Sequence, residues 1–432
     1  MIENPLADPQ GRKQGLEVLR HRWIILIPLF FMWFFGQADK TNISVIIPDN
    51  NFIRELHFLP HSAALGALMT YFLVGYGIST IIWGFIIDWL PSRIIAVAAA
   101  LMWGMGLVWF GVGNSHLSLY LSRFYLGLAE GALYPLANSL VAEWFPFRER
   151  GKATSIWFCG VGSGPAIATP LFALAVSNIG WRMSFISLGI FEVVFLCPLC
   201  FLTIRNVHAR GPRTQGRGVE PAEGTDELPE IGQRIYKAGG GSPLFFVRSS
   251  VYWANVLCNV ANGLAMWGST TWLLAYLTQV RKYTLIQSGL FVGLGFLLDV
   301  CITLYVGIRS DRRQRRAPYG IFLYIVVLVA MGMSVWSPWP LLSALAVVVT
   351  IGILAAAPAV FQTLLHSYIP RPSMGRASGI MSFMNNSISS ISPVIVGMLV
   401  GINNNWTAAF VWLMFWPLVA LGVMVWFQRL RL

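Results

Sequence analysis

Charged residues are scarce in this chain of 432 residues. Only 11% of them are Asp, Glu, Lys or Arg and 56% are hydrophobic, against about 25% and about 45–50% in soluble domains. Acidic residues are the scarcer kind, with 18 against 30 basic ones, and the formal net charge is +12. This composition excludes a water-soluble enzyme, so the positions of the few charges become the main source of information.

The chain also has few of the side-chain sets that enzymes and metal sites use. Its five cysteines are an odd number in apolar stretches, which predicts reduced thiols rather than disulfides or a zinc site. The six histidines lie at span ends and loops, and no nucleotide-binding loop of the form Gly-x-x-x-x-Gly-Lys-Ser/Thr occurs. We therefore expect no metal, no cofactor, no ATP-driven step and no enzymatic activity.

Long apolar runs are abundant. A helix needs roughly 20 apolar residues to cross the hydrocarbon core of a membrane. The sequence supplies twelve such stretches, at residues 23–47, 63–87, 94–112, 117–141, 153–176, 183–204, 249–279, 286–308, 318–336, 340–365, 376–402 and 407–428. The fold class predicted is an all-α membrane protein with twelve transmembrane helices.

One polar segment divides these spans into two groups of six. Residues 205–248 are rich in Gly, Pro, Arg and acidic residues, and this composition buries too little apolar area to fold alone. We predict a linker there, between an N-terminal half at 23–204 and a C-terminal half at 249–428. Residues 1–22 and 429–432 form the expected tails, and no cleavable signal peptide is visible.

The basic residues favour one orientation in the membrane. With the tails, the linker and the even-numbered connections assigned to one side, that side holds 24 of the 30 lysines and arginines. By the positive-inside rule we expect both termini in the cytoplasm, and a location in the inner membrane. Because the basic residues are spread over seven segments, no folded nucleic-acid-binding domain is predicted.

An internal repeat supports the two halves. The loop GFIIDWLPSR after the second span, from Gly84 to Arg93, is echoed by GIRSDRRQRR after the eighth, from Gly307 to Arg316. Glycine allows close helix approach, and the aspartate can pair with a basic residue in one conformation only. The residues predicted to gate the conformational change are Gly84, Asp88, Arg93, Gly307, Asp311 and Arg312; the alternative is a solvated loop that only follows topology.

These motifs resemble a known family. The repeated Gly-x-x-x-Asp loop, the twelve spans and the central linker resemble the major facilitator superfamily over the whole chain. Three stretches resemble its anion:cation symporter family of organic-anion carriers: Asp39 to Ser44, Arg123 through Glu130 and Pro135 to Glu149-Arg150, and Gly180-Trp181-Arg182. The resemblance implies two pseudo-symmetric halves and a small organic anion carried with protons.

Charges inside the spans are the candidates for mechanism, because one at the bilayer centre costs roughly 2.5–3.5 kcal/mol or more. They are Asp39, Lys40, Arg123, Glu130, Glu192 and Asp299. Arg123 and Glu130 are two helical turns apart and share one face of the fourth span. A structural salt bridge from that span to the first is the alternative to a functional role. Glu192 is predicted to be structural.

The resemblance assigns substrate contacts to Lys40, Tyr76, Arg123 and Asn386. The family has Asp-Arg where this chain has Asp39-Lys40. Arginine binds a carboxylate through a planar fork, whereas lysine is a compact point charge, so Lys40 would neutralise an anion with looser geometry.

Glu130 and Asp39 are predicted to couple transport to protons. A carboxylate in a medium of low dielectric gains proton affinity, and Arg123 nearby can hold the charged form of Glu130. Its protonation would release Arg123 and bias which side is open.

Asp299 is the unusual acid. The internal repeat sets it opposite Tyr76, since each lies eight residues before its loop glycine, and the family does not usually have an acid there. Three interpretations compete: a second proton site, a partner for a substrate ammonium or hydroxyl group, and a salt-bridge partner for Lys40. A side chain that only reaches out of the membrane is the fourth. We list Asp299, with Glu130 and Asp39, as a candidate proton-coupling residue.

The predicted function is proton-coupled uptake of a small organic anion, such as a sugar acid, aromatic acid or dicarboxylate, by alternating access of the two halves. The predicted partners are the substrate, protons and the lipid bilayer, with no nucleic acid and a monomeric state. The alternatives are an exchanger or exporter of the same fold, and a sensor that has lost transport.

Overall fold

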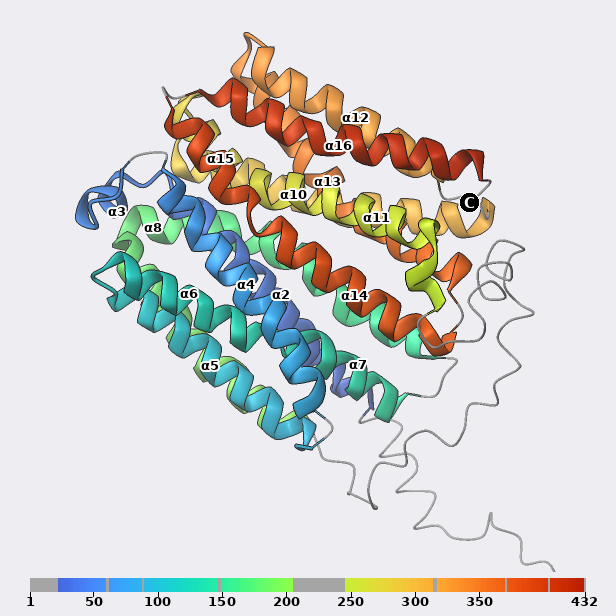
Figure 1. The fold of residues 1–432 in the computed structure, drawn as a ribbon. Coiled ribbons are helices and arrows are strands. Elements are labelled where there is room, and N and C mark those ends of the chain that lie inside the picture. The colour runs from blue at the N-terminus through green and yellow to red at the C-terminus, as the bar shows by residue number, and fades with distance from the viewer. Residues whose placement is uncertain are drawn as a thin grey trace, which may run out of the picture.

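The computed structural model describes residues 22–59, 62–87, 89–145, 149–204, 245–313, 317–369, 371–402 and 405–430. Every regular element within these ranges is helical, and the long helices form one bundle (Figure 1). The predicted tail at 1–22 and linker at 205–248 lie outside the described residues, except for Arg22 and residues 245–248.

The first group of helices runs from Leu26 to Thr203. Its members are α2 (Leu26–Ile46), the short α3 (Asn50–Glu55), α4 (Ala63–Ile86), α5 (Ser92–Val112), α6 (His116–Glu130), α7 (Leu133–Trp144) and α8 (Arg150–Thr203). The fourth span, predicted as one helix over 117–141, is split between α6 and α7. A straight helix of 54 residues would be about 80 Å long, well beyond the thickness of a membrane. The chain in α8 therefore turns at Gly180, whose φ of 77° and ψ of 164° suit a residue without a Cβ, and makes two passes.

The second group follows from Phe245. It contains the 3-10 turn η2 (Phe245–Arg248) and then α10 (Ser250–Gln279), α11 (Leu285–Arg313), α12 (Ala317–Trp336), α13 (Pro340–Tyr368), α14 (Arg371–Ser389), α15 (Ser392–Gly401) and α16 (Trp406–Arg429). α14 and α15 are two parts of one pass. Pro393 lies in the first turn of α15, where its missing N–H leaves no hydrogen bond unmade.

The predicted twelve passes are confirmed within the described residues. Length and composition alone mark only eight stretches as able to cross a membrane, one of which is the two-pass α8. α6 and α7 are too short to qualify separately, and α2 and α10 carry polar residues such as Lys40 and Asn259. The passes that composition misses are therefore those that carry polar groups into the interior.

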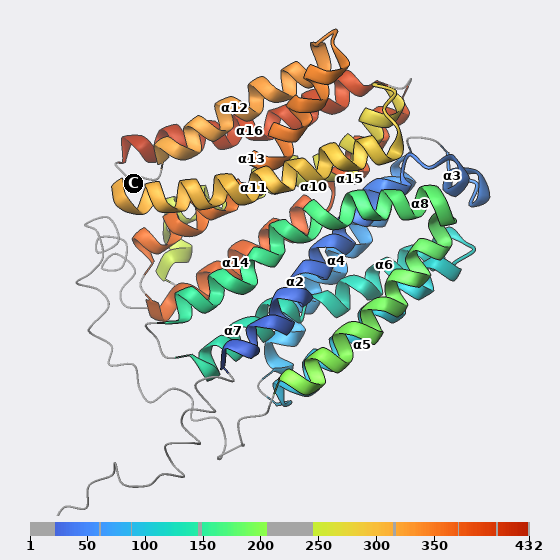
Figure 2. The ribbon, with the colours of Figure 1, turned by 180° about the vertical axis from the view of Figure 1, so that it is seen from behind.

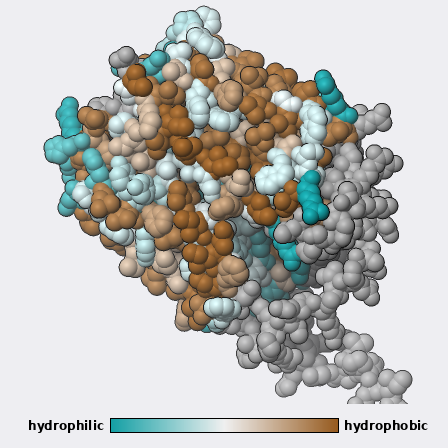
Figure 3. Space-filling view, in the orientation of Figure 1, coloured by the Kyte–Doolittle hydropathy of each residue, from teal (hydrophilic) through white to brown (hydrophobic). Residues whose placement is uncertain are grey.

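The outer surface suits a lipid environment. Large hydrophobic side chains such as Phe85, Leu117 and Leu202 are more than 60% exposed. The space-filling view shows hydrophobic residues over much of the side of the bundle, with the most hydrophilic residues toward its ends (Figure 3). An exposed apolar surface of this extent would be unfavourable in water and is favourable in contact with lipid.

The two groups lie side by side, with α14 and α15 next to α4 and with α11 next to the first pass of α8 (Figures 1 and 2). We call the end of the bundle that holds α3 the α3 side. The other end, which holds Thr203 and Ser250 on either side of the predicted linker, is the linker side.

The groups are in close contact on the α3 side. A Cβ at Gly66 of α4 would overlap the main-chain oxygen of Pro393 in α15, and one at Gly397 would lie 2.7 Å from the main-chain oxygen of Ser62. Glycine lets these backbones meet, as in other small-residue contacts between membrane helices. Thr70 also donates a hydrogen bond from its hydroxyl to the main-chain oxygen of Ser390.

No such contact occurs at two glycines nearer to the linker side. A Cβ at Gly84 of α4 or at Gly379 of α14 would meet no atom of the described residues within 4 Å. The close helix approach that we expected at Gly84 is thus not made in this conformation. The contacts between the described residues close the α3 side, and these two glycines make no matching contact toward the linker side.

Arg182 links the turn within α8 to α3 and to the end of α5. Its guanidinium donates to Glu55 at 2.6 Å and to the main-chain oxygens of Gly111 and Gly113 at 2.9 and 2.8 Å. These oxygens end α5, where a cation also interacts favourably with the helix dipole. Trp181 donates from its indole nitrogen to the other carboxylate oxygen of Glu55 at 2.9 Å.

We expect Gly66→Ala to destabilise the closed contact by about 1–3 kcal/mol, because the added methyl group overlaps a backbone atom that cannot move aside alone. Thermal unfolding of the purified protein in detergent measures this. The matched control is Gly422→Ala in α16, where a Cβ meets nothing within 4 Å. Equal melting temperatures for the two variants would contradict the close packing of α4 on α15.

The hydrogen bonds from Arg182 lower the pKa of the Glu55 carboxyl below its usual range. A lowered pKa in the folded protein stabilises above the unfolded value of about 4.3 and is lost as pH falls through the folded value. We expect Glu55→Gln to reduce the free energy of unfolding by about 0.5–1 kcal/mol at pH 7, since the pair is largely exposed. The difference from the parent protein should begin to shrink below about pH 4.3 and disappear once the pH falls below the lowered folded value. A difference that grew in acid would contradict this ion pair.

Candidate functional site

A buried ion pair joins α2 to the end of α6. Lys40 Nζ lies 3.4 Å from Glu130 Oε2, and the side chains are 4% and 0% exposed. The Lys40 ammonium also lies 4.5 Å from the ring centroid of Tyr76 on α4, a distance at which cation–π attraction operates. Three of the predicted site residues are thus in direct contact.

Small residues hold α6 close to α4 and so position Glu130. Cβ atoms at Gly127 and Gly131 would overlap the main-chain oxygen of Phe72 and the hydroxyl of Ser79. This Gly-x-x-x-Gly spacing is typical of closely packed membrane helices. On α2, Gly36 leaves room for the carboxylate, since a Cβ there would lie 3.3 Å from Glu130 Oε2.

Arg123 lies on the same helix but has different partners. Its Nη1 donates to the main-chain oxygen of Asp39 at 3.3 Å, and its guanidinium carbon lies 4.4 and 5.1 Å from the ring centroids of Phe110 and Phe185. Its Nε and Nη2 are buried and make no hydrogen bond with any described residue. In this conformation the partner of Glu130 is therefore Lys40, not Arg123 as we had expected.

Asp39 points away from Lys40, as the 100° step along a helix requires. One of its oxygens accepts from the amide of Asn42 at 3.1 Å. Glu192, on the second pass of α8, faces this part of α2, because Phe191 and Phe195 beside it pack against Phe35, one turn before Asp39, and the two carboxyl groups interact. Both acids are 0% exposed. The structure thus adds to the cluster a residue that we had predicted to be structural.

A cavity of about 130 Å³ lies between the two groups of helices. Its polar lining consists of Gln37 from α2, Asn259 and Asn262 from α10, Asp299 from α11 and Asn385 from α14. Its apolar lining includes Met266, Trp267 and Phe296. A mostly apolar hollow with a few converging polar groups is the usual form of a small-molecule site.

Asp299 faces this cavity. It is 7% exposed, and its Oδ1 accepts a hydrogen bond from Thr303 at 2.9 Å. A Cβ at Gly162, on the first pass of α8, would lie 3.1 Å from its other oxygen, so glycine there permits the contact between the groups. Lys40 is paired with Glu130, and no ion pair with Asp299 occurs among the described residues.

The cavity and the ion pair are neighbours along α2. Gln37 lines the cavity and Lys40 follows three residues later, on the adjoining turn of the same face. No lysine or arginine is among the residues that line the cavity. Lys40 and Arg123 therefore do not line the cavity in this conformation.

Asn385 and Asn386 lie on different faces of α14. Asn385 lines the cavity, whereas the Cβ of Asn386 lies 3.9 Å from the position of a Cβ at Gly77, next to Tyr76 on α4. Tyr76 and Asn386 are both predicted substrate contacts. Tyr76 touches the ion pair, and Asn386 faces the helix that carries Tyr76. Their roles in binding stay predictions.

The asparagines of α10 were missed at the sequence level. Asn255, Asn259 and Asn262 recur at helical spacing in an apolar span, and that spacing is a signal of a polar face. Two of them are structural, because Asn255 donates to Tyr368 at 2.9 Å and Asn262 to the main-chain oxygen of Leu354 at 3.0 Å. Asn259 and Asn262 both line the cavity, and the Asn262 amide is already bonded to Leu354 and Tyr324.

The predicted gating residues are only partly described. The guanidinium carbon of Arg93 lies 3.6 Å from the ring centroid of Phe201. Asp88 lies outside the described residues. Gly307, Asp311 and Arg312 belong to the last turns of α11, and their side chains are outside the described set. The gating role stays a prediction.

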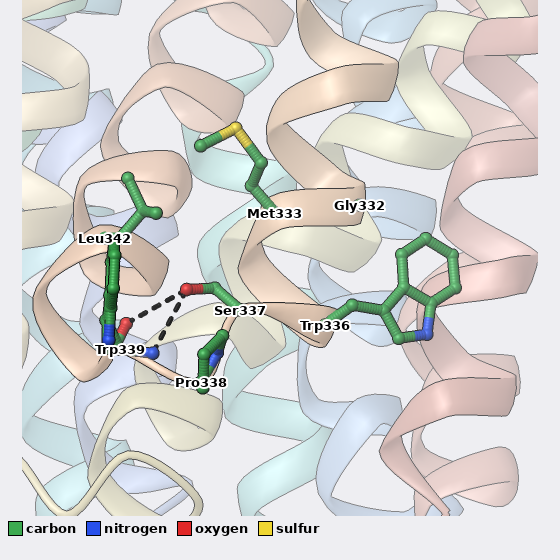
Figure 4. Close-up of a pocket in the computed structure, with 7 residues that line it drawn as sticks. All are labelled: Gly332, Met333, Trp336, Ser337, Pro338, Trp339 and Leu342. Atoms are coloured by element: carbon green, nitrogen blue, oxygen red, sulfur yellow. Dashed lines mark hydrogen bonds between the residues drawn. The ribbon is translucent and has the colours of Figure 1, made fainter.

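A second hollow, of about 410 Å³, lies at the α12–α13 connection on the α3 side (Figure 4). It is open and almost wholly apolar, with Trp336 and Trp339 on its walls, both more than 60% exposed. The Ser337 hydroxyl bonds to the main chain of Trp339 at 3.2 and 3.3 Å. Exposed tryptophans at the end of a bundle are typical of the membrane interface, so we do not assign this hollow to the substrate.

Comparison with known proteins settles the family. Residues 29–393 match the model of the Major Facilitator Superfamily. The chain belongs to that superfamily. Its members are transporters, as are the relatives described next, which agrees with the prediction that this chain is not an enzyme.

Several relatives of this superfamily member are named for organic anions. A "Probable sulfoacetate transporter" of Cupriavidus necator is 30% identical over 69% of this chain and 67% of its own. A "Probable L-galactonate transporter" of Escherichia coli is 22% identical over 93% and 88%. A "Probable galactarate/D-glucarate transporter" of Bacillus subtilis is 23% identical over 93% and 90%. The resemblance to organic-anion carriers is confirmed.

Solved structures agree on the fold. A bacterial homolog of the human lysosomal transporter Spinster, in an inward-facing and unoccupied conformation, has a TM-score of 0.74 at 16% identity. The match covers 95% of this chain and 98% of that one. A nucleoside transporter gives 0.71 at 11% identity over 94% and 99%. At these identities the likeness extends to the fold alone.

We expect Lys40→Ala to destabilise the protein by about 3–5 kcal/mol, because it leaves the Glu130 carboxylate buried without its ion-pair partner. Adding Glu130→Gln should recover much of that loss, so the two changes are not additive in a double-mutant cycle of unfolding free energies. The control cycle is Lys40→Ala with Asp299→Ala, which should be additive within about 0.5 kcal/mol. The reverse pattern would mean that Lys40 pairs with Asp299.

Proposed function

We propose that this protein is a secondary active transporter that takes up a small organic anion together with protons. The observation that carries the proposal is the buried pair of Lys40 and Glu130 beside a cavity between the two halves. A buried cation that is neutralised by a carboxyl group can exchange that partner for a substrate anion, provided that the carboxyl group takes up a proton.

The exchange would run as follows. Protonation of Glu130 removes its charge and leaves the Lys40 ammonium without a partner in a site of low dielectric. An incoming carboxylate or sulfonate then replaces Glu130 at Lys40, with Tyr76 against the same ammonium. Arg123, with two donors that bond to no described residue, supplies further positive charge. Proton and anion thereby bind together, which is the requirement for symport.

The cavity supports a small hydrophilic substrate. Its amide and carboxyl groups, from Gln37, Asn259, Asn385 and Asp299, can bond to hydroxyl groups on a sugar acid or related anion. The relatives named for sulfoacetate, L-galactonate and galactarate/D-glucarate support the same class. Aromatic acids and other dicarboxylates remain candidate substrates.

Alternating access follows from the packing of the two halves. The cavity lies between the two halves, and the contacts at Gly66, Thr70 and Gly397 close the α3 side. With the linker side in the cytoplasm, as the basic residues favour, this is an inward-facing conformation. The proposed location is the inner membrane, with cytoplasmic termini and a monomeric carrier. The paired loops at Gly84 to Arg93 and Gly307 to Arg316 would gate the linker side.

The direct test is uptake into proteoliposomes with an imposed inward proton gradient. Sulfoacetate, galactonate, galactarate and glucarate are the first substrates, ranked beforehand by the rise in melting temperature they cause. We expect accumulation that a protonophore abolishes. Glu130→Gln should abolish gradient-driven accumulation but keep exchange of internal for external substrate, because a neutral side chain at 130 frees Lys40 permanently.

The matched control is Glu55→Gln, which changes an acid outside the membrane and should leave uptake unaltered. Gradient-driven accumulation that survives Glu130→Gln would refute the coupling role of Glu130. Exchange without any response to the gradient in the parent protein would identify an exchanger instead. Efflux driven by the same gradient would identify an exporter.

A further inference from the structure

Glu192 is a buried carboxyl group without a cation. It is 0% exposed, and neither of its oxygens accepts a hydrogen bond from any described residue. No lysine or arginine nitrogen among the described residues lies within 4 Å of it, since the ion pairs found there are Arg22 with Glu149, Lys40 with Glu130 and Arg182 with Glu55. An ionised carboxylate in such a place would be strongly destabilising.

The surroundings of Glu192 keep water away. Phe191 and Phe195, next to it on α8, pack against Phe35 of α2 at centroid distances of 5.9 and 6.1 Å. On the other side, α8 approaches α5 so closely that a Cβ at Gly104 would lie 2.5 Å from the main-chain oxygen of Gly189. Neither contact supplies a donor for the carboxyl group.

The group that reaches Glu192 is another acid. Asp39 lies one turn beyond Phe35 on α2, whose ring packs against Phe191 and Phe195 on either side of Glu192, and the two carboxyl groups are close enough to interact. The Oδ2 of Asp39 is likewise buried without a donor among the described residues. A hydrogen bond between two carboxyl groups needs a proton on one of them. Two carboxylates this close cannot both be ionised without strong repulsion.

Charge balance in the whole cluster leads to the same conclusion. The ionisable groups that act on the pair of Asp39 and Glu192 are Lys40 of α2 and Arg123 and Glu130 of α6. Three acids thus face two bases. Full ionisation would leave one uncompensated negative charge in a region of low dielectric, and one bound proton removes it.

We propose that Asp39 and Glu192 share one bound proton in the folded protein, which makes Glu192 a proton-binding residue of the cluster. One ionised carboxyl group then remains in this pair for Arg123, and Glu130 remains for Lys40. The pair titrates as a unit, so its proton belongs to both residues.

The shared proton has a consequence for transport, and this part rests on the proposed function. Loss of the proton would leave Asp39 and Glu192 repelling each other between α2 and α8. Arg123 would then be drawn toward the doubly charged pair and away from an incoming anion. Glu192 would in that way set the pH at which the cluster accepts substrate.

Infrared spectroscopy of the purified protein tests the proton itself. A protonated carboxyl group absorbs at higher frequency than a carboxylate, and the band shifts in heavy water. At neutral pH we expect Glu192→Gln to lose the intensity of one such band, because the glutamine amide donates to Asp39 without a proton. Asp39→Asn should lose the same band. Glu55→Gln is the control, since its carboxylate is paired with Arg182 and contributes no such band.

Retention of the full band in a folded Glu192→Gln protein, judged by gel filtration and melting temperature, would overturn the proposal. If Glu192→Gln does not fold, a second test uses the parent protein. With glutamate labelled by carbon-13, the band should contain a component that moves with the label. A band that is insensitive to the label in both the parent protein and Glu130→Gln would also overturn it.

The pH dependence of stability provides an independent measurement. A proton that is held in the folded state and released on unfolding raises the unfolding equilibrium constant tenfold for each pH unit between the two titration ranges. Glu192→Gln should reduce that slope by one proton, and Glu55→Gln should not. These results do not depend on transport, so a protein that transported nothing would refute the proposed function and leave the shared proton standing.

Discussion

The burial of ionised groups away from water is the constraint on which the N-terminal half depends. Lys40 and Glu130 satisfy each other at 3.4 Å, and Arg123 is held by a main-chain oxygen and two aromatic rings. Each of these groups would be costly alone in lipid, and together they are tolerable because partners replace water. Such a cluster is stable in one charge state at a time, which is the property that a proton-dependent carrier requires.

Glycine makes that arrangement possible. The ion pair needs α6 close to α4 and α2, and Gly127, Gly131 and Gly36 remove the side chains that would hold these helices apart. The same device joins the two halves at Gly66 and closes the α3 side. Because lipid provides no hydrophobic force between helices, close packing of small residues has to provide the association. The contacts that position the charges and those that close one side therefore have a common physical origin.

The sequence predicted the passes well, and the places where the structure differs are local. The fourth span is split after Glu130, and the fifth and sixth follow each other through Gly180, whose φ of 77° interrupts the helix and turns the chain. Hydropathy reports how apolar a stretch is and not where its helix breaks. The site was harder to predict, because the partner of a buried charge is chosen in three dimensions. The sequence left Asp299 open as a partner of Lys40, and the structure pairs Lys40 with Glu130.

From the sequence alone came the membrane class, the twelve passes, the favoured orientation and the short set of intramembrane charges, because hydrophobicity and charge act through composition and order along the chain. Only the tertiary structure decided that Lys40 pairs with Glu130 and that Asp299 faces a separate cavity. It also brought the stretch of α8 that carries Glu192 against the stretch of α2 that carries Asp39. These outcomes depend on distances of a few ångströms between helices far apart in sequence, and electrostatic energies in a medium of low dielectric change steeply over such distances.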